Sequence, residues 1–391
     1  MKILFVNIYT GIQGGIGYYV NALARKLNQK GHETYLIHGG QLGQEKTFDR
    51  YYRLPELWDN LLALSNSTKR KLDNIVEDCT PDIIYFHKIE NGKAIDYLAD
   101  QAPAVRYVHD YQTVDPDGKM LLRNPVEPNT HPLSISCFFR AYTRKTMPRN
   151  PVKAVKAYMR AKNSLEATRH LKRIIVASEY MKNTLVRNGV GQEKIDVIPY
   201  FVDYIDEGQH VDEDKRSILY SGRIIDGKGL DELLSILKFV KQDFVLDVVG
   251  SGPDEELFAK KAKELDLSDK VIFRGWVKHE NLPQFYQKAS VLIMPSVWPE
   301  PFGICGIEAA FFGKPTIAFN VGGIPEWLAD GVNGYLIRPY DRREMADKID
   351  MLLRDGGKAE SMGKAGRKIV EERFLPEAHL DRLLNIFNEL C

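Results

Sequence analysis

The chain has 391 residues, of which 44% are hydrophobic and 27% charged, as in ordinary soluble globular proteins. This length favours two domains, each large enough for its own core. No apolar run approaches the ~18 residues of a membrane-spanning helix, and the four cysteines show no paired spacing that would indicate a disulfide framework or a zinc site. The first apolar run reaches Asn7 too early for a signal-peptide core, so we expect a cytoplasmic protein.

The formal net charge of +1 hides an uneven distribution. Eleven lysines and arginines lie between Arg140 and Arg173 against one acidic residue, Glu166, so the rest of the chain is acidic overall. Such a run can be the solvated face of a helix, or it can make peripheral contact with an anionic membrane. Nucleic acid is a weaker candidate, because the aromatic residues do not interleave in a way that suggests base stacking.

Short apolar runs alternate with helical patterns along the whole chain, which predicts an α/β protein with two parallel sheets covered by helices. The predicted strands of the first sheet are Ile3–Ile8, Thr34–His38, Ile83–His87, Val105–His109, Ile174–Ser178 and Val197–Tyr200. Those of the second sheet are Ile218–Ser221, Phe244–Gly250, Val271–Trp276, Val291–Pro295, Thr316–Phe319 and Gly334–Arg338. Residues 111–150 are the longest irregular stretch, and such a stretch is usually functional or mobile.

The break between the two series falls in a polar stretch without apolar periodicity. We therefore predict an N-terminal Rossmann-like domain at 1–203, a linker at 204–216 and a C-terminal Rossmann-like domain at 217–373. Residues 374–391 predict a terminal helix. Its apolar face consists of Leu380, Leu383, Leu384 and Phe387.

The loop Gly11–Gly17 joins the first predicted strand to the first predicted helix, at the edge where an open parallel sheet binds ligands. It does not match a dinucleotide-binding fingerprint, because Val20 stands where the last glycine is expected. The second predicted strand also ends in His38-Gly39-Gly40 and not in an acidic residue for a ribose. Gly14 and Gly15 are candidates for lining a ligand site; the alternative is a purely tight turn.

Residues 221–229, SGRIIDGKG, place two cations near the end of a predicted strand. Arg223 follows the strand closely, and Lys228 lies in a glycine-flanked loop before the next helix. One fork-shaped and one point-like cation suit a diphosphate, particularly one that becomes more negative as it leaves.

Residues 300–308, EPFGICGIE, follow another predicted strand and open an apolar helix. A helix N-terminus offers unpaired N–H groups and a partial positive charge, so it attracts phosphate. Glu300 and Glu308 would frame that anion site, and carboxylates accept hydrogen bonds from sugar and ribose hydroxyls. The pattern predicts a ligand with a diphosphate in the middle and hydroxyl-rich groups at each end, which describes a nucleotide sugar.

With these motifs the chain resembles family 4 of the retaining glycosyltransferases, or glycosyl transferases group 1. The resemblance continues through 308–341, which contains VGGIPE, and back to GGIGYYVNALA at 14–24. It implies the GT-B fold, in which two doubly wound Rossmann-like domains face a cleft and the C-terminal helix crosses back to the N-terminal domain. The chain departs from the family at EAAFFG, where EAMACG or similar is usual, so Phe311 and Phe312 suggest altered packing behind the site.

The resemblance also implies roles for single residues. Arg223 and Lys228 would hold the departing diphosphate, Glu308 the ribose and Glu300 the donor sugar. His109, at the end of a predicted strand where a histidine is more often structural, would donate to or accept from a sugar hydroxyl. The predicted catalytic residues are therefore Arg223, Lys228, Glu300 and His109. The predicted donor-binding residues are Gly14, Gly15, Gly222, Arg223, Lys228, Gly250, Val277, Glu300, Phe302, Gly303, Ile304, Cys305 and Glu308, with the base near 275–278 and Cys305 contributing only its backbone.

A different class of glycosyltransferase holds a metal ion with a D-x-D motif, and Asp115-Pro116-Asp117 matches that pattern. Here Pro-Asp-Gly is a good turn sequence, and no apolar strand leads directly into it. The two cations and the helix N-terminus can carry the charge of the leaving group. We therefore expect neither a metal ion nor another cofactor.

These features predict a glycosyltransferase of the hexosyltransferase type, as in polysaccharide biosynthesis. It would move a sugar from a nucleotide diphosphate sugar, with UDP the commonest carrier, to a glycan, lipid-linked or small-molecule acceptor. No carboxylate stands out as a covalent nucleophile, so a same-face mechanism with retention is expected. The alternatives are a GT-B-fold nucleotide-sugar epimerase, which needs further acid/base groups, and a catalytically silent nucleotide-sugar-binding module, against which the presence of all four donor-holding side chains argues.

Overall fold

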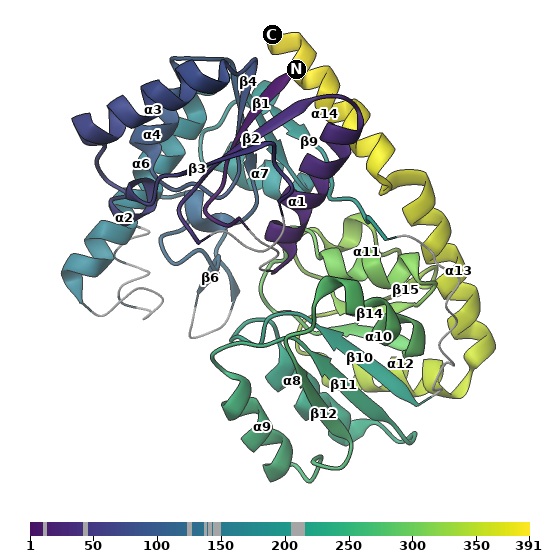
Figure 1. The fold of residues 1–391 in the computed structure, drawn as a ribbon. Coiled ribbons are helices and arrows are strands. Elements are labelled where there is room, and N and C mark those ends of the chain that lie inside the picture. The colour runs from purple at the N-terminus through teal and green to yellow at the C-terminus, as the bar shows by residue number, and fades with distance from the viewer. Residues whose placement is uncertain are drawn as a thin grey trace. The chain divides into compact units, whose positions relative to one another are not determined.

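The structure is a computed structural model that describes residues 1–10, 14–41, 46–122, 127–136, 139, 143, 150–204 and 216–391. The chain divides into two compact units (Figure 1). The first is Met1–Pro199 together with Pro376–Cys391, and the second is Tyr200–Leu375. The predicted linker, 204–216, lies outside the described residues except at its two ends.

The described part of the first unit contains a parallel sheet with the strand order β3-β2-β1-β4-β5-β8-β9. Its strands are β1 (Lys2–Val6), β2 (Glu33–His38), β3 (Arg50–Arg53), β4 (Ile83–Phe86), β5 (Ala104–Val108), β8 (Arg173–Val176) and β9 (Ile195–Val197). A short antiparallel pair consists of β6 (Leu121–Leu122) and β7 (Glu127–Pro128). The helices are α1 (Gly14–Gln29), α2 (Glu56–Asp59), α3 (Asn66–Cys79), α4 (Gly92–Ala99), η1 (Tyr111–Thr113), α6 (Pro151–His170), α7 (Glu179–Arg187), η2 (Gln192–Lys194) and α14 (Pro376–Leu390). Figure 1 shows α3, α4 and α6 on one face of this sheet and α1 and α14 on the other.

The described part of the second unit also contains a parallel sheet, in the order β12-β11-β10-β13-β14-β15. Its strands are β10 (Ser217–Ser221), β11 (Val245–Val249), β12 (Val271–Gly275), β13 (Val291–Met294), β14 (Thr316–Phe319) and β15 (Gly334–Ile337). Its helices are α8 (Leu230–Ile236), η3 (Leu237–Phe239), α9 (Glu255–Glu264), η4 (His279–Asn281), α10 (Pro283–Lys288), α11 (Ile304–Phe311), η5 (Ile324–Glu326), α12 (Arg342–Arg354) and α13 (Gly356–Arg373).

The two sheets confirm the predicted α/β architecture. Helices cover both faces of a parallel sheet, so its inner strands are near-continuous apolar runs, and β4 (IIYF) and β13 (VLIM) are buried at every position. The predicted strands appear with ends within two residues of their expected positions, with one exception. The prediction of Val197–Tyr200 was wrong: β9 ends at Val197, and the next carbonyl, that of Ile198, accepts a hydrogen bond from the Tyr107 hydroxyl at 2.8 Å.

Among the residues that the structure describes, three strands were not predicted from the sequence. β3 (RYYR) is an edge strand without a buried residue, so it has no apolar run to reveal it. The two-residue strands β6 and β7 fall in the stretch predicted to be irregular.

The terminal helix α14 packs on the first unit, as predicted. Leu380, Leu383 and Phe387 are buried, and the ring of Phe387 meets that of Tyr85 edge-on at 5.2 Å. A polar contact also fixes the helix: the Nδ1–H of His379 donates to the carbonyl of Pro199 at 2.7 Å, so its Nε2 accepts from the Tyr19 hydroxyl at 2.8 Å. Burial lowers the pKa of His379 to about 4, so this imidazole is neutral near pH 7.

Acid should therefore weaken the attachment of α14. As the pH falls below 6.5 the unfolded chain binds a proton at His379 before the folded one does, so folding stability is lost between pH 6.5 and about 4. The loss attributable to His379 amounts to about 2 kcal/mol by pH 5. We expect a flatter pH dependence of unfolding in His379→Asn than in the wild type, measured by urea denaturation between pH 7.5 and 4.5. Parallel profiles for the two proteins would rule this linkage out.

Candidate active site

The order of the strands reverses at β10 in the second unit, because β10 pairs with β11 on one side and with β13 on the other. In open α/β sheets, ligands bind outside the carboxyl ends of the strands at such a point. The loop after β10 carries Arg223 and Lys228, and the loop after β13 leads to Glu300. The topology therefore brings the two strongest sequence motifs to one edge of one sheet.

The two loops approach each other backbone to backbone. A side chain at Gly229 would place its Cβ 1.8 Å from the carbonyl oxygen of Pro295, and the φ of Gly229 is +76°, so only glycine fits there. The carbonyl of Gly227 accepts hydrogen bonds at 3.0 Å from the N–H groups of both Val297 and Trp298. These contacts hold Lys228 against the loop that bears Glu300.

Lys228 and Glu300 form an ion pair. The Lys228 Nζ lies 2.8 Å from both carboxylate oxygens of Glu300, and the Ser296 hydroxyl donates to the same carboxylate. Glu300 is only 5% exposed, so its charge requires a partner. The ammonium also lies over the ring of Trp298, 4.3 Å from its centre. An ammonium has three N–H donors, so the pair with Glu300 still leaves Lys228 one donor for a ligand.

The VGGIPE loop fixes the backbone of Glu300. The N–H of Gly323 donates to the carbonyl of Glu300 at 2.8 Å. The preceding Gly322 has a φ of +58°, and a Cβ there would lie 2.1 Å from the same carbonyl oxygen. The glycines of this motif therefore allow the close approach that positions Glu300.

Helix α11 begins just beyond Glu300. Gly303 precedes the helix with a φ of +94° and has no side chain to cap it, so the first N–H groups, those of Ile304 and Cys305, can serve an anion. The Trp327 indole donates to the carbonyl of Phe302 at 2.7 Å and fixes this turn. Burial raises the pKa of the Cys305 thiol to about 12, so it is not a thiolate nucleophile near pH 7.

Glu308 lies in the second turn of α11, where two tyrosines hold it. The Tyr286 hydroxyl donates to Oε2 at 2.7 Å and the Tyr204 hydroxyl to Oε1 at 3.2 Å, while His279 stacks on Tyr204 at 4.4 Å. Burial raises the pKa of Glu308, although both tyrosine hydrogen bonds oppose that shift. A carboxylate has about four acceptor sites, so it can still accept from ribose hydroxyls. Neither tyrosine was predicted from the sequence, because they lie 104 and 22 residues from Glu308 and no motif connects them to it.

The remaining predicted residues of the second unit lie on loops at the same edge. Gly250 has a φ of +134°, and a Cβ there would lie 1.9 Å from the carbonyl oxygen of Gly222, so these loops also touch. The Arg223 side chain is exposed, and Val277 is half-buried in the loop after β12.

In the first unit, Gly14 and Gly15 form the exposed start of α1; Gly11 to Gln13 lie outside the described residues. His109 follows β5 and is buried, 5% exposed, with its Nε2 2.9 Å from Nδ1 of His87. Burial, together with the charges of Lys88 and Arg106, holds the pKa of His109 well below 6.5, so the ring is neutral.

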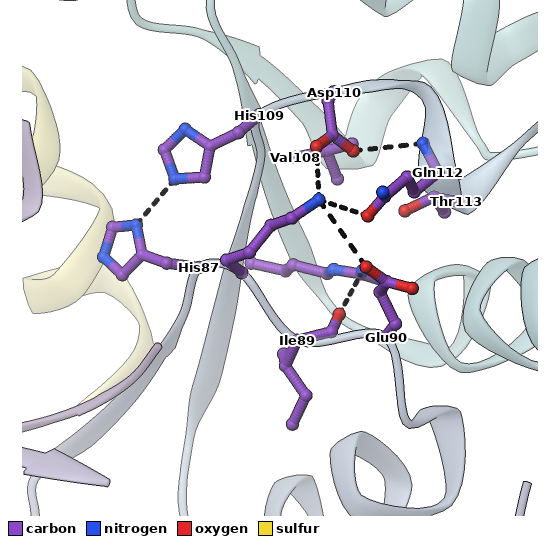
Figure 2. Close-up of a pocket in the computed structure, with 10 residues that line it drawn as sticks. His87, Ile89, Glu90, Val108, His109, Asp110, Gln112 and Thr113 are labelled. Atoms are coloured by element: carbon purple, nitrogen blue, oxygen red, sulfur yellow. Dashed lines mark hydrogen bonds and ion pairs between the residues drawn. The ribbon is translucent and has the colours of Figure 1, made fainter. Parts of the chain in front are cut away.

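A small pocket opens beside His109 at the ends of β4 and β5 (Figure 2). Lys88 lines this pocket, and its ammonium donates to Asp110 and Gln112, with Glu90 3.6 Å away. Sequence patterns gave no sign of this group, because each residue is an ordinary charged residue in a loop. Its members can donate to and accept from hydroxyl groups.

The segment with the D-x-D pattern forms a turn. The carboxylate of Asp115 is buried and accepts from the N–H groups of Lys119 and Met120 at 2.9 and 2.8 Å. Burial raises its pKa to about 6. Within the described ranges, no group of three or more histidine, cysteine, aspartate and glutamate side chains is placed to hold a metal ion.

Several members of the basic run serve the protein's own packing. Arg160 pairs with Glu90 at 3.0 Å, Arg169 donates to the carbonyl of Asn188, and Arg173 pairs with Asp196. The residues Arg140, Arg144, Lys145 and Arg149 lie outside the described residues. A search of the described helices finds none with the length and apolar character needed to cross a membrane.

Comparison with known proteins gives consistent results. The model of Glycosyltransferase Family 4 matches residues 13–204, and that of Glycosyl transferases group 1 matches residues 203–369. An uncharacterized glycosyltransferase of Methanocaldococcus jannaschii is 24% identical over 96% of this chain and 94% of its own length. Two further curated relatives are matched over 51% and 64% of their lengths.

Solved structures show the same fold. Sucrose-phosphate synthase from Thermosynechococcus elongatus superposes with a TM-score of 0.77 at 20% identity, over 100% of this chain and 98% of that one. HepE of Anabaena, in complex with UDP, superposes with a TM-score of 0.73 at 19% identity over 100% of both chains. The chain therefore belongs to the family 4 glycosyltransferases, glycosyl transferases group 1, and is a glycosyltransferase of the GT-B fold class.

Proposed function

We propose that this enzyme transfers a sugar from a nucleotide diphosphate sugar, preferably a UDP-sugar, to a glycan, lipid-linked or small-molecule acceptor, with retention and without a metal ion. The observation that carries the proposal is the Lys228–Glu300 pair beside the start of α11, with Glu308 buried one turn further along. This arrangement offers a cation, unpaired N–H groups and two carboxylates to one ligand.

Each part of the donor has a partner in this arrangement. Arg223, the spare donor of Lys228 and the first N–H groups of α11 bind the diphosphate and stabilise its charge as it leaves. Glu308 accepts from the ribose, and the loop at 275–278 receives the base. Glu300 accepts from a hydroxyl of the donor sugar, and the complex of HepE with UDP supports the choice of UDP.

Retention by a same-face reaction is consistent with the charges at this edge. The carboxylate of Glu300 already accepts from Lys228 and Ser296, and the Cys305 thiol is protonated. Neither the Glu300 carboxylate nor the Cys305 thiol is therefore prepared to attack the sugar. In the proposed mechanism the departing phosphate assists deprotonation of the acceptor, and no metal ion takes part.

Purified protein incubated separately with UDP-, GDP- and ADP-sugars tests the proposal. We expect one donor class to release free nucleoside diphosphate, with an unchanged rate in EDTA. Interconversion of the sugar diphosphates would instead indicate an epimerase. Loss of activity in EDTA with recovery in Mn²⁺ or Mg²⁺ would contradict the metal-free mechanism.

Mutations of the two cations should both impair catalysis but should differ in their effect on stability. Losing a charged contact to the leaving group should lower kcat by about 100-fold or more in Arg223→Ala and in Lys228→Ala. Arg223 is exposed, so its loss should leave thermal stability unchanged. Lys228→Ala strands the buried Glu300 charge, so we expect it to destabilise the protein by a few kcal/mol.

Addition of Glu300→Gln to Lys228→Ala should restore stability without restoring turnover, because it removes the unpaired charge. Lys260→Ala, at a side chain with 75% exposure, serves as the control. Near-wild-type kcat in either single variant would remove the diphosphate assignment.

We also propose that the first half of α6 contacts an anionic membrane surface, which would suit a lipid-linked acceptor. Val152, Val155 and Met159 are 61%, 49% and 38% exposed, and exposed Lys153 and Lys156 alternate with them. Such a surface combines apolar insertion with attraction to anionic lipid.

Reversal of Lys153 and Lys156 to Glu should abolish sedimentation with vesicles that contain anionic lipid, and salt should weaken the wild-type binding. Reversal of exposed Lys93 and Lys238 is the charge-matched control. Equal sedimentation of the wild type with neutral and anionic vesicles, or with neither, would contradict membrane contact and would indicate that α6 is only a solvated surface helix.

A further inference from the structure

We propose that His87 is a positioning residue for His109: its Nδ1–H donates to Nε2 of His109 and so keeps the proton of His109 on Nδ1, as a hydrogen-bond donor for a sugar hydroxyl. The donation to a sugar hydroxyl rests on the proposed function of His109. The hydrogen bond between the two rings and the tautomer of His109 do not depend on that function.

The sheet itself creates the pair. β4 and β5 are neighbouring parallel strands with Phe86 opposite Arg106, so His87 and His109 leave the same edge of the sheet. Nδ1 of His87 lies 2.9 Å from Nε2 of His109, and the two rings are nearly parallel at 20° (Figure 2). The rings are 2% and 5% exposed, so little water competes for this bond.

Aromatic neighbours hold His87 in this orientation. Its ring stacks on Phe5 at 5.3 Å and 5°, and the ring of Tyr85 lies 4.2 Å away. On the other side, Tyr107 stacks on His109 at 4.4 Å. The pair is therefore packed among buried aromatic rings at the carboxyl end of the sheet.

The protons of the pair can be assigned from its surroundings. Burial holds the pKa of both imidazoles well below 6.5, so each ring is neutral and carries one N–H. The ring of His87 could carry its proton on Nε2, but among the described residues that atom is buried without a hydrogen-bond partner. A buried N–H without an acceptor is rarer than a buried acceptor without a donor. The proton of His87 therefore lies on Nδ1, directed at His109.

This assignment limits the chemistry of His109. Its Nε2 accepts the bond from His87, so its single proton lies on Nδ1. A neutral ring held in this tautomer donates to an oxygen and does not withdraw a proton through Nδ1. In this state His109 can donate to a sugar hydroxyl and does not serve as the base for an acceptor.

Nitrogen-15 NMR of the histidine-labelled protein reads the tautomer without any substrate. The chain has nine histidines, and the His109 signals are identified by their loss in His109→Asn. We expect a protonated Nδ1 and an unprotonated Nε2 at His109 in the wild type. In His87→Phe, which replaces the donor with an apolar ring, we expect the Nε2 signal of His109 to lose the shift of a hydrogen-bonded acceptor, whereas His87→Asn retains a donor and that shift.

A wild-type His109 that carries its proton on Nε2 would overturn the proposal even if His87→Phe failed to fold. An unchanged Nε2 signal of His109 in a folded His87→Phe would overturn it as well, because that signal reports the hydrogen bond that the variant removes.

Kinetics then tests the link to catalysis. We expect His87→Phe to lower kcat by about 10-fold or more with little change in the donor KM, and His87→Asn to retain more of kcat than His87→Phe. Adding His87→Phe to His109→Phe should cost nothing further, because both remove one unit. If the tautomer is as assigned but His109→Phe turns over normally, the pairing stands and the proposed role of His109 fails.

Discussion

A carboxylate buried at the end of a parallel sheet must have its charge balanced, and Glu300 imposes this constraint on the second unit. It is 5% exposed, and Lys228 contacts both of its oxygens. A buried carboxylate that loses its partner destabilises a protein by several kcal/mol, so the fold must hold the two loops together. Gly229 and Gly322 allow the close backbone contacts that achieve this. The same constraint places a cation, a carboxylate and a helix N-terminus around one point before any ligand arrives.

Each unit places its polar side chains at the carboxyl edge of its own parallel sheet, but the chemistry of the two edges differs. In the second unit, charged side chains and open N–H groups gather there, as a diphosphate requires. In the first unit, the rings of His87 and His109 are neutral because they are buried, and the charged group around Lys88 lies beside them. A neutral imidazole has one N–H donor and one acceptor nitrogen, which suits hydroxyl recognition.

Much of this could be predicted from sequence, because the physical signals are local. Apolar runs of four or five residues mark buried strands, and a glycine-flanked cation or a glutamate before an apolar helix marks a loop at a strand end. The features that could not be predicted either depend on residues far apart in the sequence or have no recognisable sequence pattern. Tyr204 and Tyr286 reach Glu308 only through the tertiary fold, and β3 has no buried residue to reveal it.

The basic run between Arg140 and Arg173 shows that a count of charged residues can also predict too much. Three arginines of this run carry the same charge as their neighbours, yet each one binds an acceptor within the first unit. They are Arg160, Arg169 and Arg173. Only the structure separates them from the exposed lysines of α6. Burial and partners, which composition does not contain, decide which charges are available to a ligand or a surface.

The central claim is that the Lys228–Glu300 pair and the start of α11 hold the diphosphate of a nucleotide sugar. A crystal structure of the protein with UDP tests it most directly. We predict phosphate oxygens within hydrogen-bond distance of Lys228, Arg223 and the N–H groups of Ile304 and Cys305, with the ribose on Glu308. A nucleotide bound elsewhere, or bound here with its phosphates directed away from Lys228 and α11, would contradict it.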